Sequence, residues 1–189
     1  MLDVGCSAGA LGRPLASRGV IVDGIEFDDA AAAEARAWYR RMIVGDVEHT
    51  SLDLEPGSYD AIICADILEQ LRHPEELLMR LRPLLAPGGV LLVSIPNISN
   101  WSMRLLHLMG GRWEYTDRGI LDRTRVRFFY RRSFERLIHQ SGYRTRALDV
   151  TVPLPLLRRE PFNRLAHWFG LRCKNLLAYQ FVTVAEPLE

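Results

Sequence analysis

The residues whose types and spacing most suggest chemistry form a glycine-rich stretch, 3–12, with the sequence DVGCSAGALG. Glycine has no Cβ, so a turn of this kind lets the backbone approach a bound ligand closely. Where such a turn joins a strand to a helix, its backbone commonly binds part of a nucleotide. The stretch therefore predicts a ligand site, with an ordinary tight turn as the alternative.

The spacing excludes two common nucleotide motifs. Counted from Gly5, the dinucleotide fingerprint G-x-G-x-x-G would need glycine where the chain has Ser7 and Ala10. A phosphate-binding loop needs Gly-Lys followed by Ser or Thr, and the single lysine of the chain, Lys174, is far from this stretch. The stretch therefore predicts neither an NAD site nor a P-loop.

Short hydrophobic runs alternate with helical patterns along the chain, which is the order of a doubly wound α/β sheet. The hydrophobic runs before residue 97 are continuous, as in parallel strands covered on both faces. One domain, 1–189, is predicted. Strands are predicted at 1–4, 20–26, 41–46, 59–66, 90–96, 143–152 and 176–186, and helices at 11–18, 28–39, 73–89, 131–142 and 162–171.

Acidic residues stand at the carboxyl ends of four predicted strands: Asp3, Glu26, Asp46 and Asp66. In a doubly wound sheet the ligand lies beyond these ends of the strands. One acid at a strand end is commonplace, but four in order favour a common site.

This combination resembles the class I S-adenosylmethionine-dependent methyltransferases, whose first motif runs acid-x-Gly-x-Gly-x-Gly. The chain matches that motif at Asp3, Gly5 and Gly9, with Ser7 in place of the middle glycine, and LAPGGVLLVSIPN (85–97) resembles the turn and fifth strand of the family. The resemblance implies a Rossmann-like fold with seven strands, mostly parallel, and an antiparallel last strand. It also implies S-adenosylmethionine as cofactor and S-adenosylhomocysteine as product.

The resemblance assigns a role to each strand end in the half of the chain expected to bind the cofactor, 1–96. Glu26 is expected to accept the ribose hydroxyls, because a carboxylate can accept two O–H groups at once. Phe27 would pack on the adenine, and Asp46 would bind the adenine amino group. The full set of expected cofactor contacts is Asp3, Gly5, Cys6, Ser7, Gly9, Glu26, Phe27, Asp46, Val47, Ala65 and Asp66.

The segment 97–131 has weak periodicity and is expected to form a lid over the acceptor. NWSMRLLHLMGGRWEYTDRGILDRTRVRFF (100–129) resembles a branch of these enzymes often associated with cell-surface glycan biosynthesis, in which this segment covers the acceptor. A small-molecule or glycan acceptor is therefore expected, with oxygen as the methylated atom. The expected acceptor contacts are Asn97, Trp101, Tyr115, Arg125 and Arg127.

Arginines are concentrated beside these contacts. Between Arg112 and Arg136 there are eight arginines and four acids, while the whole chain has a net charge of only +1. Guanidinium groups bind carboxylate or phosphate through paired hydrogen bonds. The excess predicts an anionic acceptor, such as a sugar nucleotide or a lipid-phosphate-linked glycan, with a solvated basic surface as the alternative.

The chain departs from the family at positions that bear on catalysis. The branch often carries histidine where this chain has Gln70 and Arg125, and neither of these residues can act as a base. Asp122 and His107 remain as weak candidates for that role, His107 with a structural helix-face position as the alternative.

The fold is also expected to be short at the N-terminus, because the family usually has a helix before its first strand. This expectation and the missing histidines keep a second function open. In that reading the chain is a non-catalytic protein that binds the cofactor or partners an active enzyme.

The composition of the chain limits which functions and locations are compatible with these interpretations. The chain has 189 residues, 48% of them hydrophobic, and no apolar run reaches the ~20 residues of a transmembrane helix. The three cysteines lie far apart, so neither a metal site nor a disulfide framework is expected. The absence of paired cysteines is typical of a reducing compartment, so a cytoplasmic location is expected. A net charge near zero, and ADIL rather than Asn/Asp-Pro-Pro-Tyr after the fourth strand, argue against a nucleic-acid substrate. A homodimer is left open.

Overall fold

The structure is a computed structural model that describes residues 1–110, 115–116, 119–152, 168 and 171–188. The strands within these residues are β1 (Leu2–Val4), β2 (Asp23–Glu26), β3 (Arg41–Val44), β4 (Tyr59–Ala65), β5 (Leu85–Pro96), β6 (Tyr143–Thr151) and β7 (Gln180–Pro187). The α-helices are α1 (Gly12–Ala16), α2 (Asp29–Ala35), α3 (Pro74–Leu81), α4 (Trp101–Gly110), α5 (Arg131–Gln140) and α7 (Lys174–Leu177). Single 3-10 turns are η1 (Arg36–Trp38), η2 (Leu68–Gln70) and η3 (Arg82–Leu84).

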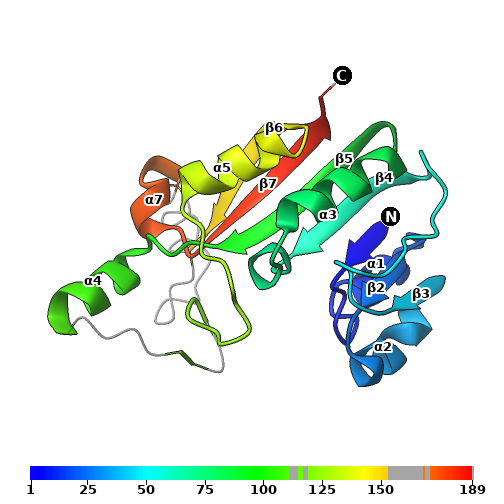
Figure 1. The fold of residues 1–189 in the computed structure, drawn as a ribbon, viewed down its shortest axis with the longest axis horizontal. Coiled ribbons are helices and arrows are strands. Elements are labelled where there is room, and N and C mark those ends of the chain that lie inside the picture. Colours follow the sequence, from blue (N-terminus) through cyan, green and yellow to red (C-terminus); the bar gives the residue numbers. More distant parts are fainter. Residues whose placement is uncertain (111–114, 117–118, 153–167, 169–170, 189) are drawn as a thin grey trace.

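All of these strands belong to one sheet with the order β3-β2-β1-β4-β5-β7-β6 (Figure 1). The first five strands pair in parallel, and β7 runs antiparallel to both β5 and β6. The sequence prediction of a mostly parallel seven-stranded sheet with an antiparallel last strand is therefore confirmed. The strand order reverses at β1 and β4, which is where a doubly wound sheet binds its ligand.

Hydrophobic side chains cover the sheet on both faces, because alternate residues of a strand point to opposite sides. Leu2, Val4 and Ile25 belong to the main core, which also contains buried residues of α3 and α5. These two helices lie side by side across the sheet (Figure 1). Tyr39 and Ala35 belong to a second cluster with Cys6. The glycine turn after β1 thus starts from a strand packed on both sides.

The sequence of α5 accounts for both its helical conformation and its packing on the sheet. Its buried side chains, Phe134, Leu137 and Ile138, have the i, i+3, i+4 spacing of one helix face. The Ser133 hydroxyl accepts a hydrogen bond from the N–H of the N-cap residue Tyr130 at 3.1 Å and donates to the Tyr130 carbonyl at 2.9 Å, which starts the helix. The helix leads into β6, whose first residue Tyr143 is fully buried and donates its hydroxyl hydrogen to the Leu78 carbonyl, 2.9 Å away.

The predicted helix 73–89 is too long, and its last part is a strand. Helix α3 ends at Leu81, and β5 already begins at Leu85, which pairs with Tyr59. The register then shifts, so that Val90 pairs with Ala61. Pro87, Gly88 and Gly89 therefore form an irregularity inside β5 rather than a helix stop. Proline has no N–H for the ladder and glycine tolerates the bend.

Two further boundaries differ from the sequence predictions. The segment 97–131, expected to lack regular structure, contains the helix α4. The last strand starts at Gln180 rather than 176, after the short helix α7. The predicted helix 162–171 lies outside the described residues except for positions 168 and 171.

The three cysteines differ in their exposure to solvent. Cys6 and Cys64 are buried, and Cys173, just before α7, is exposed. Burial raises the pKa of the Cys6 thiol to about 12 and also raises that of Cys64.

Within the described residues, no helix combines the length and the hydropathy that crossing a membrane would need.

A buried carboxylate, Asp23, joins the amino ends of three strands. Its oxygens accept hydrogen bonds from Arg40 Nε at 2.9 Å, Arg40 Nη2 at 2.6 Å and the Tyr59 hydroxyl at 2.7 Å. Burial disfavours ionisation of Asp23, but the hydrogen bonds from Arg40 and Tyr59 outweigh it and leave the pKa below its usual value. The ionised form of Asp23 therefore stabilises the folded sheet.

We expect Asp23→Asn to lower the free energy of unfolding by about 1–3 kcal/mol at neutral pH, because an amide cannot accept all three hydrogen bonds. The folded pKa is depressed, so this contribution is present above the ordinary Asp pKa of about 3.9 and is lost as the pH falls through the folded pKa. Urea unfolding at neutral and acidic pH measures it. Asp53→Asn, at an exposed pair with Arg41, is the control and should change little. A loss of the same size at every pH would contradict the charge-based explanation.

Candidate functional site

A pocket of about 370 Å³ opens at the carboxyl ends of β3, β2, β1 and β4, which are neighbours in the sheet. The turn after each of these strands supplies part of its wall. The pocket is lined by Gly5, Ser7, Ile25, Glu26, Phe27, Gly45, Asp46, Val47, Glu48, Asp66, Ile67, Gln70 and Leu71. The structure thus brings together seven of the predicted cofactor residues: Gly5, Ser7, Glu26, Phe27, Asp46, Val47 and Asp66.

The glycine turn closes tightly over the end of β2. The N–H groups of Gly5 and Cys6 both donate to the Ile25 carbonyl, at 2.8 and 3.1 Å. Gly5 has a φ of +75°, and a Cβ there would come within 3.0 Å of the Ile67 side chain. Ser7, in the middle-glycine position of the motif, also has a positive φ, 46°. Such a backbone is unusual for serine and is held by the surrounding turn.

Gly9 lies outside the pocket and has a packing function. A Cβ on Gly9 would come within 3.2 Å of both Ala35 and Trp38. The missing side chain lets the turn pack against α2 and η1. Two further predicted cofactor contacts, Cys6 and Ala65, are likewise absent from the residues that line the pocket.

Asp3 also differs from its predicted role. Its carboxylate is buried, with the residue 1% exposed, and accepts a hydrogen bond from the Tyr39 hydroxyl at 2.6 Å. Burial raises the pKa of Asp3 despite this hydrogen bond. Asp3 therefore faces the cluster of Tyr39 and Cys6, and it is not among the residues that line the pocket.

Glu26 is held in place by backbone groups on both sides of the pocket. Its two oxygens accept from the Ser7 N–H at 2.7 Å and the Asp28 N–H at 3.0 Å. A carboxylate offers about four acceptor positions, so each oxygen keeps capacity for one further O–H donor. The side chain is thereby oriented, and both of its oxygens can still accept from hydroxyl groups of a ligand.

The pocket wall beside Glu26 combines an apolar surface with a second carboxylate. Phe27 is 73% exposed although it is a large hydrophobic residue, so its ring is available to an aromatic ligand. Asp46 accepts from the Glu48 N–H at 2.9 Å and lies 2.7 Å from His49 Nδ1. Its pKa is lowered by the Glu48 and His49 hydrogen bonds. Asp46 thus stays ionised at the pocket wall.

At the end of β4, Asp66 ties the pocket to the other half of the sheet. Its oxygens accept from the Ser94 hydroxyl at 3.1 Å and the Gln180 amide at 2.7 Å, which link β4 to β5 and β7. The Gln70 side chain donates to the Asp66 carbonyl at 2.8 Å. Gln70 therefore braces the loop that lines the pocket.

Among the predicted acceptor contacts, Asn97 is engaged in hydrogen bonds within the protein. It is fully buried, and its amide donates to the carbonyls of Asn175 and Ala178 at 3.2 and 2.9 Å. Its side-chain oxygen accepts from the Ser99 N–H. Its amide nitrogen joins the end of β5 to the segment before β7, while its oxygen holds the turn that follows β5, so the buried amide is satisfied.

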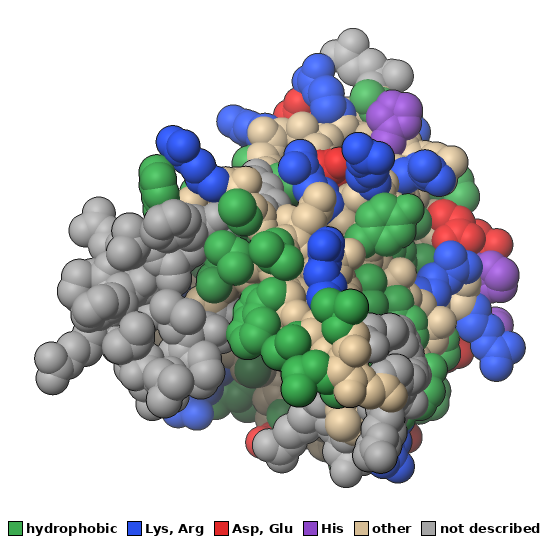
Figure 2. Space-filling model, turned by 90° about the vertical axis from the view of Figure 1, so that its left-hand side faces the viewer, with side chains coloured by type: hydrophobic (Ala, Val, Ile, Leu, Met, Phe, Trp, Pro, Cys, Tyr) green, Lys and Arg blue, Asp and Glu red, His purple; other side chains and the backbone are tan. Residues whose placement is uncertain are grey.

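Trp101 and Tyr115 are about half exposed and remain available to a ligand. His107 belongs to α4, but its side chain lies outside the described residues. Helix α4 also exposes Leu105, Leu106, Leu108 and Met109. Figure 2 views the molecule from the α4 side and shows hydrophobic side chains gathered in the middle of this face, with basic side chains above them.

Two charged residues of the segment 97–131, Arg127 and Asp122, have partners within the protein. Arg127 Nη2 lies 3.7 Å from Glu75 and also donates to the Arg72 carbonyl. Asp122 accepts from the Thr124 N–H and hydroxyl, and these hydrogen bonds lower the pKa of Asp122. A lowered pKa is unfavourable for a general base.

The sequence did not single out Glu69, which lies between the pocket-lining loop after β4 and the segment 119–129. Glu69 is 1% exposed, and Arg125 Nε is 3.5 Å from its Oε1. Burial, reinforced by Asp66 and Asp122, raises the pKa of Glu69 to about 7, although the proximity of its own backbone N–H and of Arg125 lowers it. The signal in the sequence was a lone acid inside the apolar run ILEQL.

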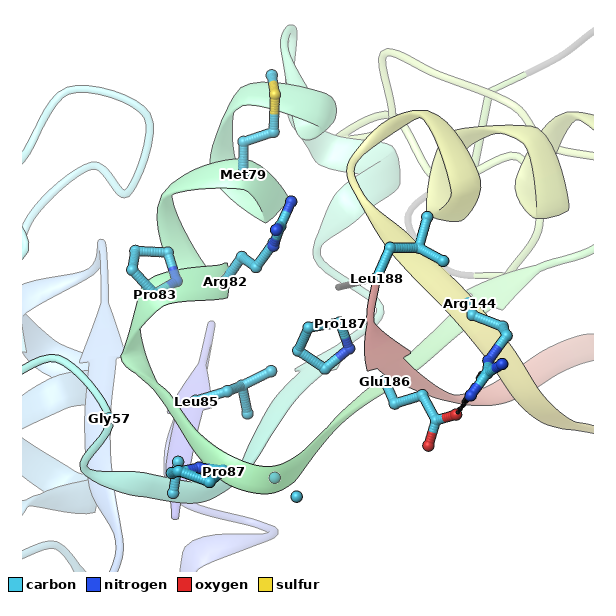
Figure 3. A pocket seen from close by; sticks show the side chains of 13 residues that line it. Gly57, Met79, Arg82, Pro83, Leu85, Pro87, Arg144, Glu186, Pro187 and Leu188 are labelled. Carbon is cyan, nitrogen blue, oxygen red and sulfur yellow. Dashed lines mark hydrogen bonds and ion pairs between the residues drawn. The ribbon is translucent and has the colours of Figure 1, made fainter.

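A larger cavity, about 1180 Å³, lies at the opposite edge of the sheet and is shown in Figure 3. Gly57, Leu85 and Pro187 place it at the amino ends of β4 and β5, where Arg144 pairs with Glu186. Ligands of doubly wound sheets bind at the carboxyl ends of the strands. We therefore assign the cofactor to the smaller pocket.

The groups around the smaller pocket fit S-adenosylmethionine. Glu26 presents two oriented acceptors, and Phe27 presents an exposed ring. Gly5 leaves the turn without a side chain where the backbone borders the pocket. These groups suit a ribose, an adenine and the chain that joins the ribose to the methionine part.

Comparison with curated proteins gives matches to ubiquinone biosynthesis O-methyltransferases. The enzyme of Acinetobacter baumannii (strain AYE) is 30% identical over 103 residues, which cover 51% of this chain and 44% of that protein. That of Pseudomonas paraeruginosa is 32% identical over the same length. The chain thus matches less than half the length of these relatives.

The fold is shared with solved methyltransferases. A SAM-dependent methyltransferase from Archaeoglobus fulgidus superimposes with a TM-score of 0.68 at 12% identity, over 97% of this chain and 84% of that one. Residues 1–148 match the family model described as a methyltransferase domain. The chain therefore belongs to the methyltransferase domain family, and its cofactor is S-adenosylmethionine.

Proposed function

We propose that the protein transfers a methyl group from S-adenosylmethionine to an oxygen atom of a small-molecule or glycan acceptor. The observation that carries the proposal is the pocket at four neighbouring strand ends, with the Glu26 carboxylate oriented by two backbone N–H groups. Family membership over residues 1–148 supports the reaction type.

Two observations support oxygen as the methylated atom. The curated relatives that match about half of the chain are named as O-methyltransferases. The segment after β4 reads ADIL and lacks the Asn/Asp-Pro-Pro-Tyr signature of enzymes that methylate amino groups.

The chemistry places modest demands on side chains. Transfer to a hydroxyl forms a carbon–oxygen bond as the carbon–sulfur bond breaks, and the hydroxyl proton leaves. The sulfonium is already a good leaving group, so alignment of the acceptor with the methyl carbon supplies much of the rate. Asp122 stays the candidate base for the proton, although its lowered pKa weakens it in that role.

A second candidate function is cofactor binding without catalysis. The observation that favours it is the engagement of Gln70 and Arg125, at the positions where relatives often carry histidine. Gln70 braces the Asp66 carbonyl, and Arg125 faces Glu69. Cofactor binding without turnover of any acceptor in a broad screen would favour this function over the first.

The described parts of 97–131 form the acceptor side of the proposed active site. The Ile98 N–H donates to the Phe129 carbonyl at 3.0 Å, so the two ends of this segment meet beside the end of β5. We include in the proposal that the segment covers the acceptor and that its arginines favour an anionic one.

The first of three predictions about ligands is that S-adenosylhomocysteine binds with a stoichiometry of one, while NAD does not bind. The reason is that the pocket offers carboxylates to the ribose and lacks the glycine fingerprint that holds a pyrophosphate. Isothermal titration calorimetry measures both. Heat with NAD and none with S-adenosylhomocysteine would refute the assignment of the pocket.

The second prediction concerns Glu26→Ala, which should weaken S-adenosylhomocysteine binding by about tenfold to a hundredfold, because unpaired ribose hydroxyls cost about 1–3 kcal/mol. Asp28→Ala is the matched control. Asp28 caps α2 by accepting from the Ala31 N–H, so its loss should cost about 1 kcal/mol of stability with the affinity unchanged. Equal affinity for Glu26→Ala and wild type would show that Glu26 only holds the turn.

The third prediction concerns the anionic acceptor. Arg127→Gln should raise KM about tenfold for a sugar nucleotide acceptor but not for the matching unphosphorylated sugar, because a guanidinium–phosphate contact is charge-assisted. High salt should reduce the difference. Arg132→Gln, on exposed α5 surface, is the control. Identical effects on the charged and uncharged acceptors would leave the arginines as ordinary surface groups.

A further inference from the structure

Glu69 is a buried carboxylate whose oxygens lack hydrogen bonds. The residue is 1% exposed, and neither oxygen accepts a hydrogen bond from any described residue. Buried polar groups are almost always satisfied, and an unpaired buried charge is costly. A side chain in this state requires a physical explanation.

Glu69 lies where the loop that lines the cofactor pocket meets the segment 119–129, a contact called the seam below. On one side, its neighbours Ile67, Gln70 and Leu71 line the cofactor pocket. On the other side, the Glu69 carbonyl accepts hydrogen bonds from the N–H groups of Val126 and Arg127, at 3.0 and 2.9 Å. These two bonds attach the end of the segment 119–129 to the loop that lines the pocket.

The charged groups facing the Glu69 carboxyl come from both sides of the seam. Asp66 faces it from the end of β4, and Asp122 and Arg125 face it from the segment. Arg125 Nε is 3.5 Å from Oε1, within ion-pair range but without a hydrogen bond, while Arg125 Nη1 donates to the Ile120 carbonyl at 3.3 Å. Among these groups, the guanidinium of Arg125 is therefore the one cation, and it faces Asp66, Asp122 and the buried carboxyl of Glu69.

Protonation and closure of this seam are thermodynamically linked. While the seam is closed, burial raises the pKa of Glu69 from 4.5 to about 7. If the segment detaches, the carboxyl enters water and its pKa returns to the ordinary value. The closed form then binds the proton more tightly, so a low pH favours closure and a rising pH favours opening.

We infer that Glu69 is a proton-controlled positioning residue, which holds the segment 119–129 against the cofactor loop when protonated and releases it when ionised. The inference rests on the proposed function only in identifying this segment as part of the acceptor side. In that role, loss of the Glu69 proton would open the acceptor side, and its return would close the segment beside the methyl donor.

Amide hydrogen exchange of the free protein tests the inference without any acceptor. The protection of the Val126 and Arg127 amides, corrected for intrinsic exchange rates, should fall about tenfold or more between about pH 5.5 and about pH 8.5. Glu69→Gln, which is isosteric and always neutral, should keep the same protection at both pH values. A pH-dependent fall of equal size in Glu69→Gln, or no fall in the wild type, would overturn the inference.

Two further variants separate this role from a purely structural one. Arg125→Met removes the only cation facing the carboxyl among the groups named above, which makes ionisation in the closed form more costly. The fall in protection should then extend to a higher pH, and an unchanged profile would count against the inference. Glu135→Gln, at the α5 pair with Arg131, should behave like the wild type.

The outcome stays decisive if Glu69→Gln fails to fold, because the wild type and Arg125→Met still give two pH profiles to compare. Failure of the exchange test leaves S-adenosylhomocysteine binding by calorimetry unaffected. Failure of that binding would reject the proposed function without altering the exchange profile. The two ideas are therefore tested separately.

Discussion

The three residues of β1 carry the constraint on which the site depends. Leu2, Asp3 and Val4 pair with β2 on one side and β4 on the other. This double pairing fixes the register of both neighbours, so the turns after Val4, Glu26 and Ala65 reach the same edge. A shift of one residue in β1 would reverse which side chains face each layer, placing Asp3 toward the core of α3 and α5 and Val4 toward Tyr39. The pocket exists because this short strand is pinned from both sides.

The carboxylates at the strand ends divide into two kinds. Asp3 and Asp23 are buried and are satisfied by tyrosine and arginine groups, so they hold the sheet together. Glu26, Asp46 and Asp66 are partly exposed, and each keeps acceptor capacity toward the pocket after its internal hydrogen bonds are made. A buried acid that is fully paired acts as a brace, whereas an oriented acid with spare lone pairs can recognise a ligand.

The sequence predicted the sheet and the cofactor edge well, because both follow from short-range patterns. Continuous hydrophobic runs identified the parallel strands, and the acids after them marked Glu26, Asp46 and Asp66 as pocket residues. The same patterns could not separate Asp3 from these acids, since its burial depends on Tyr39, 36 positions away. The functions of Asn97 and Gln70 depend on carbonyls that only the folded chain brings near. The sequence assigned no role to Glu69, because its environment depends on the segment 119–129, which pairs with it only in the folded chain.

The difference in exposure among the cysteines has a practical consequence for optical work on this protein. Cys6 and Cys64 are buried with raised pKa values, whereas Cys173 is exposed just before α7. Maleimides react with accessible thiolates, so a dye added to the native protein should attach at one site without any mutation. That site adjoins the Asn175 and Ala178 carbonyls, to which Asn97 at the end of β5 donates. Through its emission and anisotropy, a fluorophore there would report on the junction between β5 and the segment before β7.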